Sequence, residues 1–145
     1  MKVQIIAVGL LKSGPEKALF DQYTKRLNYK LKVIEIESRQ DKRIPASAYL
    51  KSLSEKDIVI ILDEGGENLS SRSFAQKLEI YSQTGKQLSF IIGGADGIPE
   101  EIKLLASFSI SFGKLTWPHL LVRALFVEQL YRAQQIMCNH PYHRD

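Results

Sequence analysis

Cysteine and long apolar runs are nearly absent from this sequence, and each absence narrows the class of protein. The 145 residues include one cysteine, Cys138, so the chain can form no internal disulfide and suits a reducing compartment. No run of about 18 apolar residues occurs, and the apolar start MKVQIIAVG is too short for a signal sequence. We therefore expect a soluble, cytoplasmic protein that has no membrane partner.

The fingerprints of several ligand classes are missing as well. The glycine-rich segment 93–97 does not match G-x-G-x-x-G, and it lacks the Lys-Ser/Thr pair of a phosphate-binding loop. The acidic segment 63–68 could bind ribose hydroxyls or a metal, but a solvated turn is the commoner outcome. No histidine or cysteine lies near it in the sequence. The sequence therefore predicts no metal site, and it does not support a dinucleotide-dependent enzyme.

The composition is that of a globular protein with a mildly basic surface. Hydrophobic residues make up 44% and charged residues 25%, which suits one domain over residues 1–145. Twenty Lys and Arg against sixteen Asp and Glu give a net charge of +4. This charge favours a polyanionic partner such as nucleic acid, although many enzymes without such a partner carry similar charge.

Short β-rich runs alternate along the chain with segments of helical character. Strands are expected at residues 3–8, 31–36, 58–62, 88–92 and 108–112. Helices are expected at residues 15–27, 46–53, 72–84, 99–106 and 118–138, with Ser70 as the cap of the third. Continuous apolar runs such as IVIIL are typical of central strands in a parallel sheet. We predict an α/β fold with a mostly parallel sheet flanked by helices, and a flexible segment at 38–44.

Two segments that follow strands contain residues suited to a ligand. The glycines of segment 89–99 permit positive φ and a close backbone approach at the carboxyl end of a strand, where ligands bind in α/β sheets. A ligand loop and a tight strand-to-helix turn are equally good interpretations of this spacing. Segment 111–119 contains the only tryptophan, Trp117, and its mixture of glycine and apolar side chains could hold an adenine. The alternative is a connection whose tryptophan lies in the core.

The helix expected at 118–138 and the tail that follows it are the other candidates. Apolar residues cover nearly the whole helix, so one face should pack on the sheet and another on a second subunit. Glu128 and Arg132 lie four residues apart and are interpreted as a helix-surface ion pair. The tail 139–145 combines histidine, tyrosine and arginine, which supply a base near neutral pH, a stacking ring and a phosphate ligand.

Four motifs in a fixed order resemble those of one known family. They are Ile92-Gly-Gly-Ala-Asp-Gly97, Leu115-Thr-Trp-Pro-His119, Glu128-Gln-Leu-Tyr-Arg-Ala133 and His140-Pro-Tyr-His-Arg144. Leu62-Asp-Glu-Gly-Gly and Ser70-Ser71 precede them. With these motifs the chain resembles the ribosomal RNA large subunit methyltransferase H family, the pseudouridine-N3 methyltransferases of the SPOUT class.

The resemblance implies properties that the residues alone do not show. Members of the family are homodimers with a deep C-terminal trefoil knot, and they hold S-adenosylmethionine (SAM) in the knot at the subunit interface. They methylate N3 of a pseudouridine in 23S ribosomal RNA. The implied partner is therefore the assembled ribosome. By the same resemblance, the SAM-binding residues are Leu62, Gly93, Phe112, Gly113, Lys114, Leu115, Thr116 and Trp117.

For this reaction, the chemistry of the tail side chains predicts a catalytic role. His143 is the candidate base that removes the N3 proton, Tyr142 would position the pyrimidine, and Arg144 would hold a phosphate or stabilise negative charge. His119 is the rival base, although its place at a helix start favours a structural role. The expected RNA contacts are Lys12, Lys17, Lys25, Arg26 and Lys30, and the alternative is a charged helix face that is only solvated. The competing function is a non-catalytic ribosome- or RNA-binding factor, against which the intact glycine loop and complete tail argue.

Overall fold

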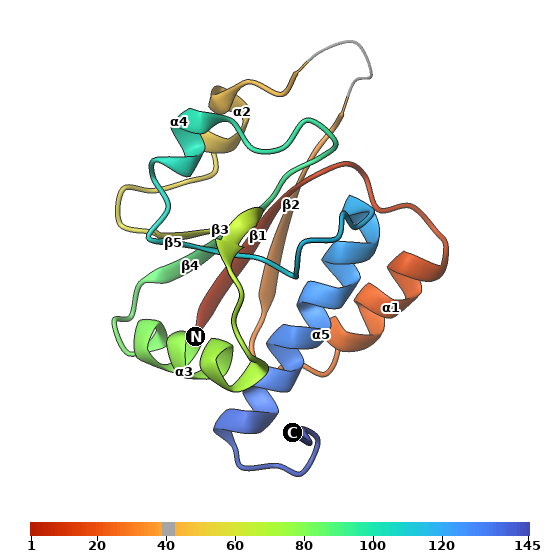
Figure 1. Cartoon of the computed structure of the whole chain (residues 1–145), viewed down its shortest axis with the longest axis vertical. Coiled ribbons are helices and arrows are strands. Elements are labelled where there is room, and N and C mark those ends of the chain that lie inside the picture. The colour runs from red at the N-terminus through yellow and green to blue at the C-terminus, as the bar shows by residue number, and fades with distance from the viewer. Residues whose placement is uncertain (39–42) are drawn as a thin grey trace.

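The computed structural model, which describes residues 1–38 and 43–145, has a parallel sheet at its centre (Figure 1). Its strands are β1 (Lys2–Val8), β2 (Leu31–Ile36), β3 (Ile58–Glu67), β4 (Gln87–Ile92) and β5 (Phe108–Ile110). Their spatial order is β2-β1-β4-β3-β5, and every neighbouring pair is parallel. The predicted α/β class with a parallel sheet flanked by helices is thereby confirmed.

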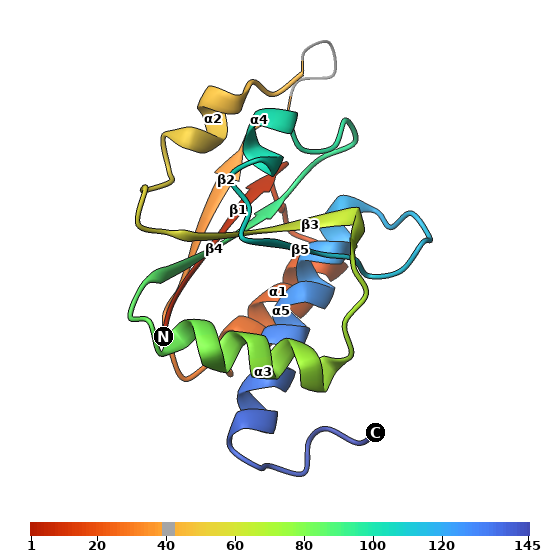
Figure 2. The same cartoon turned by 60° about the vertical axis from the view of Figure 1, so that its left-hand side comes forward.

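The helices form two layers, one on each face of the sheet. They are α1 (Pro15–Thr24), α2 (Ala46–Leu50), α3 (Ser71–Ser82), α4 (Glu100–Lys103) and α5 (His119–Met137). Helices α1, α3 and α5 pack on one face, whereas α2 and α4 pack on the other (Figure 2). Ser70 caps α3, as predicted, because its side chain accepts a hydrogen bond from the backbone N–H of Ser73. The segment 38–44, predicted to be flexible, falls largely on residues 39–42, outside the described residues.

The two helical layers explain why the strands are continuously apolar. Successive side chains of a strand point to opposite faces. Ile5 therefore packs in the core under α1, α3 and α5, whereas Ile6 packs in the core under α2 and α4. Ile60 and Ile61 divide between the same two cores. Each of these four side chains is at most 3% exposed, so both faces of the central strands need apolar residues.

Strand β3 is longer than the sequence predicts. The acidic segment 63–68 was expected to be a solvated turn, but the strand continues to Glu67 with an irregularity in its pairing to β5. Gly66 permits this extension, because a Cβ atom at that position would lie 2.7 Å from the carbonyl carbon of Ile110. The end of β3 therefore runs directly beside β5.

Helix α5 contains a buried charge that the apolar pattern did not suggest. The Arg123 side chain is 1% exposed and forms an ion pair with Glu35 of β2. Its Nη2 also donates hydrogen bonds to the carbonyl oxygens of Val8 and Gly9, at 3.2 and 2.8 Å. Arg123 thus fixes the start of α5 to the carboxyl ends of β1 and β2. Leu125 of α5 remains 37% exposed. Cover by a second subunit, and the trefoil knot, stay predictions.

Among residues 1–38 and 43–145, no helix is both long and apolar enough to cross a membrane.

Candidate functional site

A cavity of about 730 Å³ lies at the carboxyl ends of β3, β4 and β5. This volume is within the range of small-molecule sites, and the position is the usual one for ligands of an α/β sheet. The cavity brings together predicted SAM-binding residues from three separate segments: Leu62, Gly93, Phe112, Gly113, Leu115, Thr116 and Trp117. Lys114 is exposed and does not line the cavity.

The glycine loop after β4 forms one wall of the cavity. A Cβ atom on Gly93 would lie 2.9 Å from the Ile98 side chain, and one on Gly94 would lie 2.8 Å from that of Val8. Gly97 has a φ of 74°, and its N–H donates to the carbonyl of Gly94. The segment is therefore a tight strand-to-helix turn. It also lines a cavity, which the alternative interpretation as a ligand loop requires.

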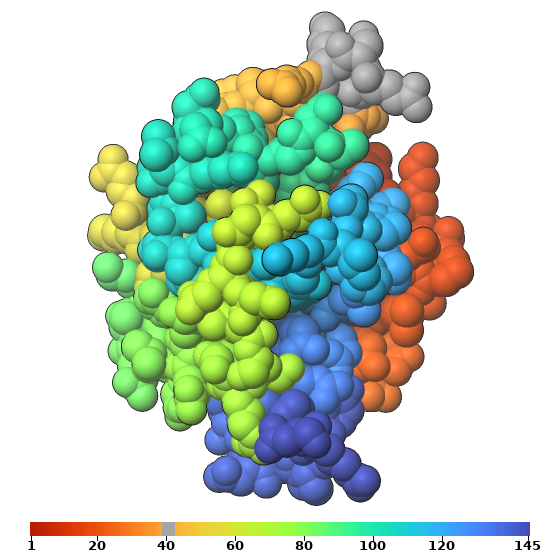
Figure 3. Space-filling model, viewed as in Figure 1, coloured from red at the N-terminus to blue at the C-terminus, as the bar shows by residue number. Residues whose placement is uncertain are grey.

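The segment before α5 forms the opposite wall. Gly113 has a φ of 103°, and Trp117 Nε1 donates to the carbonyl of Phe112 at 3.3 Å, which closes the segment on itself. Thr116 Oγ1 donates to Glu64 Oε1 at 3.0 Å and so joins this wall to the end of β3. Figure 3 shows the segment before α5 in contact with the end of β3 on one face of the molecule. Trp117 is 42% exposed, so the alternative of a core tryptophan is wrong.

Acidic side chains predominate in the cavity lining, although Lys103 Nζ lies 3.5 Å from Asp63 Oδ1 and partly neutralises that carboxylate. The lining includes the carboxylates of Asp63, Glu64 and Asp96, and among the described lining residues there is no lysine or arginine. His119 also lines the cavity, and burial, together with nearby Arg123, lowers the pKa of its imidazole from the ordinary value. The imidazole is therefore neutral at pH 7. Such a cavity disfavours phosphate groups and suits a cationic ligand with hydroxyl groups.

The tail after α5 is held to that helix by a compact set of contacts. Tyr142 Oη donates to Glu128 Oε1 at 2.9 Å, and its ring packs edge-on against Tyr131 at 4.8 Å. Burial and the Glu128 carboxylate raise the pKa of Tyr142, so the phenol keeps its proton. Arg132 forms an ion pair with Glu128 and lies over the Tyr142 ring, 4.9 Å from its centroid. The predicted Glu128–Arg132 pair therefore exists. It is more than a helix-surface ion pair, because both side chains also contact Tyr142 of the tail.

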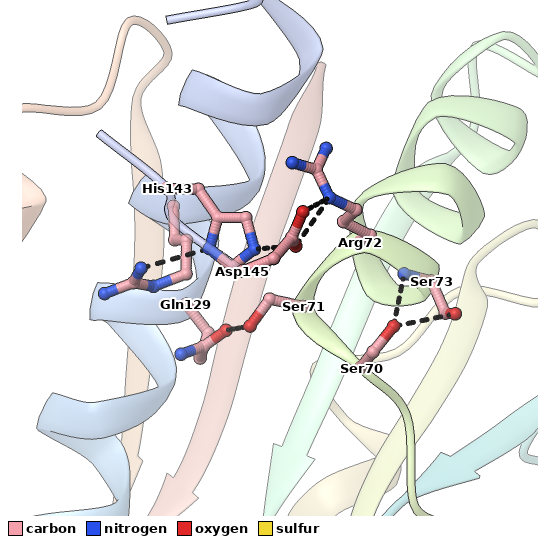
Figure 4. Close-up of polar contacts among 8 residues, drawn as sticks. Ser70, Ser71, Arg72, Ser73, Gln129, His143 and Asp145 are labelled. Carbon is pink, nitrogen blue, oxygen red and sulfur yellow. Dashed lines mark hydrogen bonds and ion pairs between the residues drawn. The ribbon is translucent and has the colours of Figure 1, made fainter. Parts of the chain in front are cut away.

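His143 uses both ring nitrogens in this network. Its Nδ1 lies 3.2 Å from Arg132 Nη1, and its Nε2 lies 3.1 Å from Asp145 Oδ1. An arginine can only donate, so Nδ1 accepts and the ring proton resides on Nε2, where Asp145 accepts it. Figure 4 shows how Asp145 in turn bonds to Arg72 of α3, whose hydrogen bond lowers the pKa of Asp145. Arg144 is exposed.

Comparisons with known proteins agree with this architecture. The family model described as "Predicted SPOUT methyltransferase" matches residues 1–143. The chain belongs to the SPOUT methyltransferase family. It is 45% identical to the ribosomal RNA large subunit methyltransferase H of Rhizobium johnstonii and 41% identical to that of Rhodospirillum centenum, with 99% of each chain covered. A solved structure, "a probable methylase family protein from Haemophilus influenzae Rd KW20", shares the fold with a TM-score of 0.59. The two chains are 12% identical, and the match covers 99% of this chain and 70% of that one.

The two parts of the site lie far apart within one chain of this SPOUT methyltransferase. Val122 is the last residue of α5 that lines the cavity, whereas the predicted base His143 contacts α5 at Arg132. Ten residues of helix separate these positions, or about 15 Å. Figures 1 and 2 both place the C-terminus at the end of α5 remote from the cavity wall. The structure thus assembles the predicted SAM-binding residues and the predicted catalytic residues, but it does not bring the two groups together.

Proposed function

We propose that this chain transfers a methyl group from SAM to N3 of a pseudouridine in 23S ribosomal RNA. We place the reaction in the cytoplasm, on the assembled ribosome, with the chain as a homodimer. Relatives that match over their full length carry the name ribosomal RNA large subunit methyltransferase H. The observation on this chain that best supports the proposal is a cavity of cofactor size whose described lining carries carboxylates and no lysine or arginine.

The residues of the cavity fit SAM better than they fit a phosphate-bearing cofactor. SAM, when bound, supplies an electrophilic methyl group on a sulfonium cation. The carboxylates of Asp63, Glu64 and Asp96 favour that cation and can accept hydrogen bonds from ribose hydroxyls. The Phe112 and Trp117 side chains offer apolar surface for an adenine. A dinucleotide would instead bring phosphates into a cavity where acidic side chains repel them.

The tail supplies the groups that act on the RNA. His143 accepts the N3 proton at Nδ1, the ring nitrogen that carries no hydrogen, while Asp145 holds the Nε2 proton and thereby orients the ring. Arg132 has to leave Nδ1 before this transfer, because its guanidinium now occupies that lone pair. Tyr142 positions the pyrimidine, and exposed Arg144 holds a phosphate.

We assign the cavity and the tail of one complete site to different subunits. Within one chain about 15 Å of helix separates the cavity lining from the His143 contact, which is too far for a base and a methyl donor to meet at one nucleotide. A two-fold dimer that covers the exposed side of α5 would make two such composite sites. Leu121 and Leu125 of that helix remain partly exposed and are available for this contact.

The direct test uses the purified protein, methyl-labelled SAM and ribosomes that lack the modification. Nuclease digestion and mass spectrometry then map the label. We expect label on N3 of a single pseudouridine. Bound SAM without label on the ribosome would reject this substrate, and failure to bind SAM would favour the competing ribosome-binding factor.

A further inference from the structure

Arg26, just beyond the end of α1, has an arrangement that the proposed reaction does not use. Its guanidinium lies over the rings of Tyr23 and Tyr131, 5.5 and 5.8 Å from their centroids. The two rings are themselves neighbours, at 6.1 Å. Arg26 is exposed, so its guanidinium contacts the two tyrosines and is also accessible to solvent.

The backbone that carries Arg26 is fixed to α5. Buried Gln134 donates from Nε2 to the carbonyl of Arg26 at 3.2 Å and accepts from the N–H of Asn28 at 2.7 Å. These bonds hold the chain between α1 and β2 in one position relative to the tail. The guanidinium therefore contacts two aromatic rings, and hydrogen bonds to Gln134 fix the backbone that carries it.

Arg26 differs from the arginines of the helices in its charge partners. Arg72, Arg123 and Arg132 each form an ion pair with an acidic side chain. No such pair involves Arg26 within residues 1–38 and 43–145. A cation held by aromatic rings alone remains available to an anionic partner.

We propose that Arg26, backed by Tyr23 and Tyr131, is a stacking platform for one unpaired nucleobase that flanks the target nucleotide. Unpaired RNA bases stack on aromatic rings and on guanidinium planes, and the nearby phosphate gains from an uncompensated cation. These tyrosine and arginine contacts continue into the tail, because Tyr142 packs against Tyr131 and Arg132 lies over Tyr142. The platform therefore adjoins His143. It rests on the proposed function and adds a contact to an unpaired base beside the target nucleotide.

The test measures RNA binding without SAM, by fluorescence anisotropy with the full chain. One probe is a fluorescein-labelled RNA stem-loop, and the other is a fully paired RNA with the same number of phosphates. Arg26→Ala removes charge and plane, whereas Arg26→Lys keeps the charge and removes the plane. Lys56→Ala removes one exposed positive charge elsewhere and serves as the matched control. Thermal unfolding of each variant checks that it folds.

We expect both Arg26 variants to weaken stem-loop binding by about tenfold, as loss of one stacked base predicts. Duplex binding should change little, and Lys56→Ala should leave the preference for the stem-loop intact. Full recovery in Arg26→Lys would show that charge alone matters and would overturn the platform. So would equal losses on both probes, or no stem-loop binding by the unaltered chain.

The same variants separate this proposal from the proposed function. If the unaltered chain prefers the stem-loop through Arg26 but ribosomes acquire no label, the platform stands and the methylation substrate is wrong. If ribosomes acquire label while both Arg26 variants bind the stem-loop normally, the platform is wrong and the reaction stands.

Discussion

At the scale of single residues, the hydrogen-bond roles of His143 follow from its two neighbours. Arg132 can only donate and Asp145 accepts, so the ring proton is assigned to Nε2 and the lone pair to Nδ1. Chemically, the tail is a histidine oriented by a carboxylate, and an arginine covers its basic atom. A composition of histidine, tyrosine and arginine suggested such chemistry, but it did not say which nitrogen would act.

Replacement of His143 by alanine tests its assignment as the base. We expect His143→Ala to lower the rate of methyl transfer about 10²–10⁴-fold, the usual contribution of a positioned base. SAM affinity, measured by calorimetry, should stay near its original value, because the side chain lies remote from the cavity of its own chain and contributes only a proton acceptor to the composite site.

His140→Ala is the matched control, since His140 is an exposed histidine of the same tail. It should retain most of the activity. A loss of SAM affinity in His143→Ala, or equal losses of rate in the two variants, would make His143 a structural residue.

At the scale of elements, α5 organises the molecule. Its first turns meet the cavity, Arg123 ties it to β1 and β2, and Glu128 and Arg132 hold the tail. The apolar pattern predicted where this helix runs but not that a charged residue, 1% exposed, would be buried between it and the sheet. That contact depends on Glu35, 88 residues earlier in the chain.

Glu35→Ala should destabilise the protein by about 3 kcal/mol, because it leaves the Arg123 charge buried without its partner. The backbone N–H of Leu11 would lose its acceptor as well. Urea unfolding followed by circular dichroism measures the change.

Glu37→Ala, which removes an exposed carboxylate just beyond the same strand, is the control and should cost less than about 0.5 kcal/mol. Similar midpoints for the two variants would show that Arg123 is stable without an ion pair.

At the scale of the whole molecule, the distance between cavity and tail has a consequence for assembly. A complete site has to draw on two chains if both groups act on one nucleotide. Activity should then be recovered by mixing two chains that are each inactive for a different reason.

His143→Ala removes the base, and Leu115→Arg introduces a cation into a cavity that suits one as its ligand. Leu115 is 74% exposed, so this change should be tolerated by the fold. Each variant alone should be nearly inactive. After the two are unfolded and refolded together, about a quarter of the original activity should return, since half of the dimers are mixed and each has one intact site. No recovery, with mixed dimers demonstrated by mass spectrometry, would place cavity and tail of one chain in the same site.

Local sequence determined much of this protein. Apolar runs predicted where each strand begins within one residue, since a strand covered on both faces needs apolar residues throughout. The loops after those strands predicted where a ligand would bind, because the carboxyl ends of parallel strands meet at one edge. Only the tertiary structure decided the extension of β3 past Gly66, the burial of Arg123 and the contacts of Arg26. Each of these depends on a partner dozens of residues away, such as Ile110, Glu35 or Gln134, and residue spacing along the chain carries no record of such a contact.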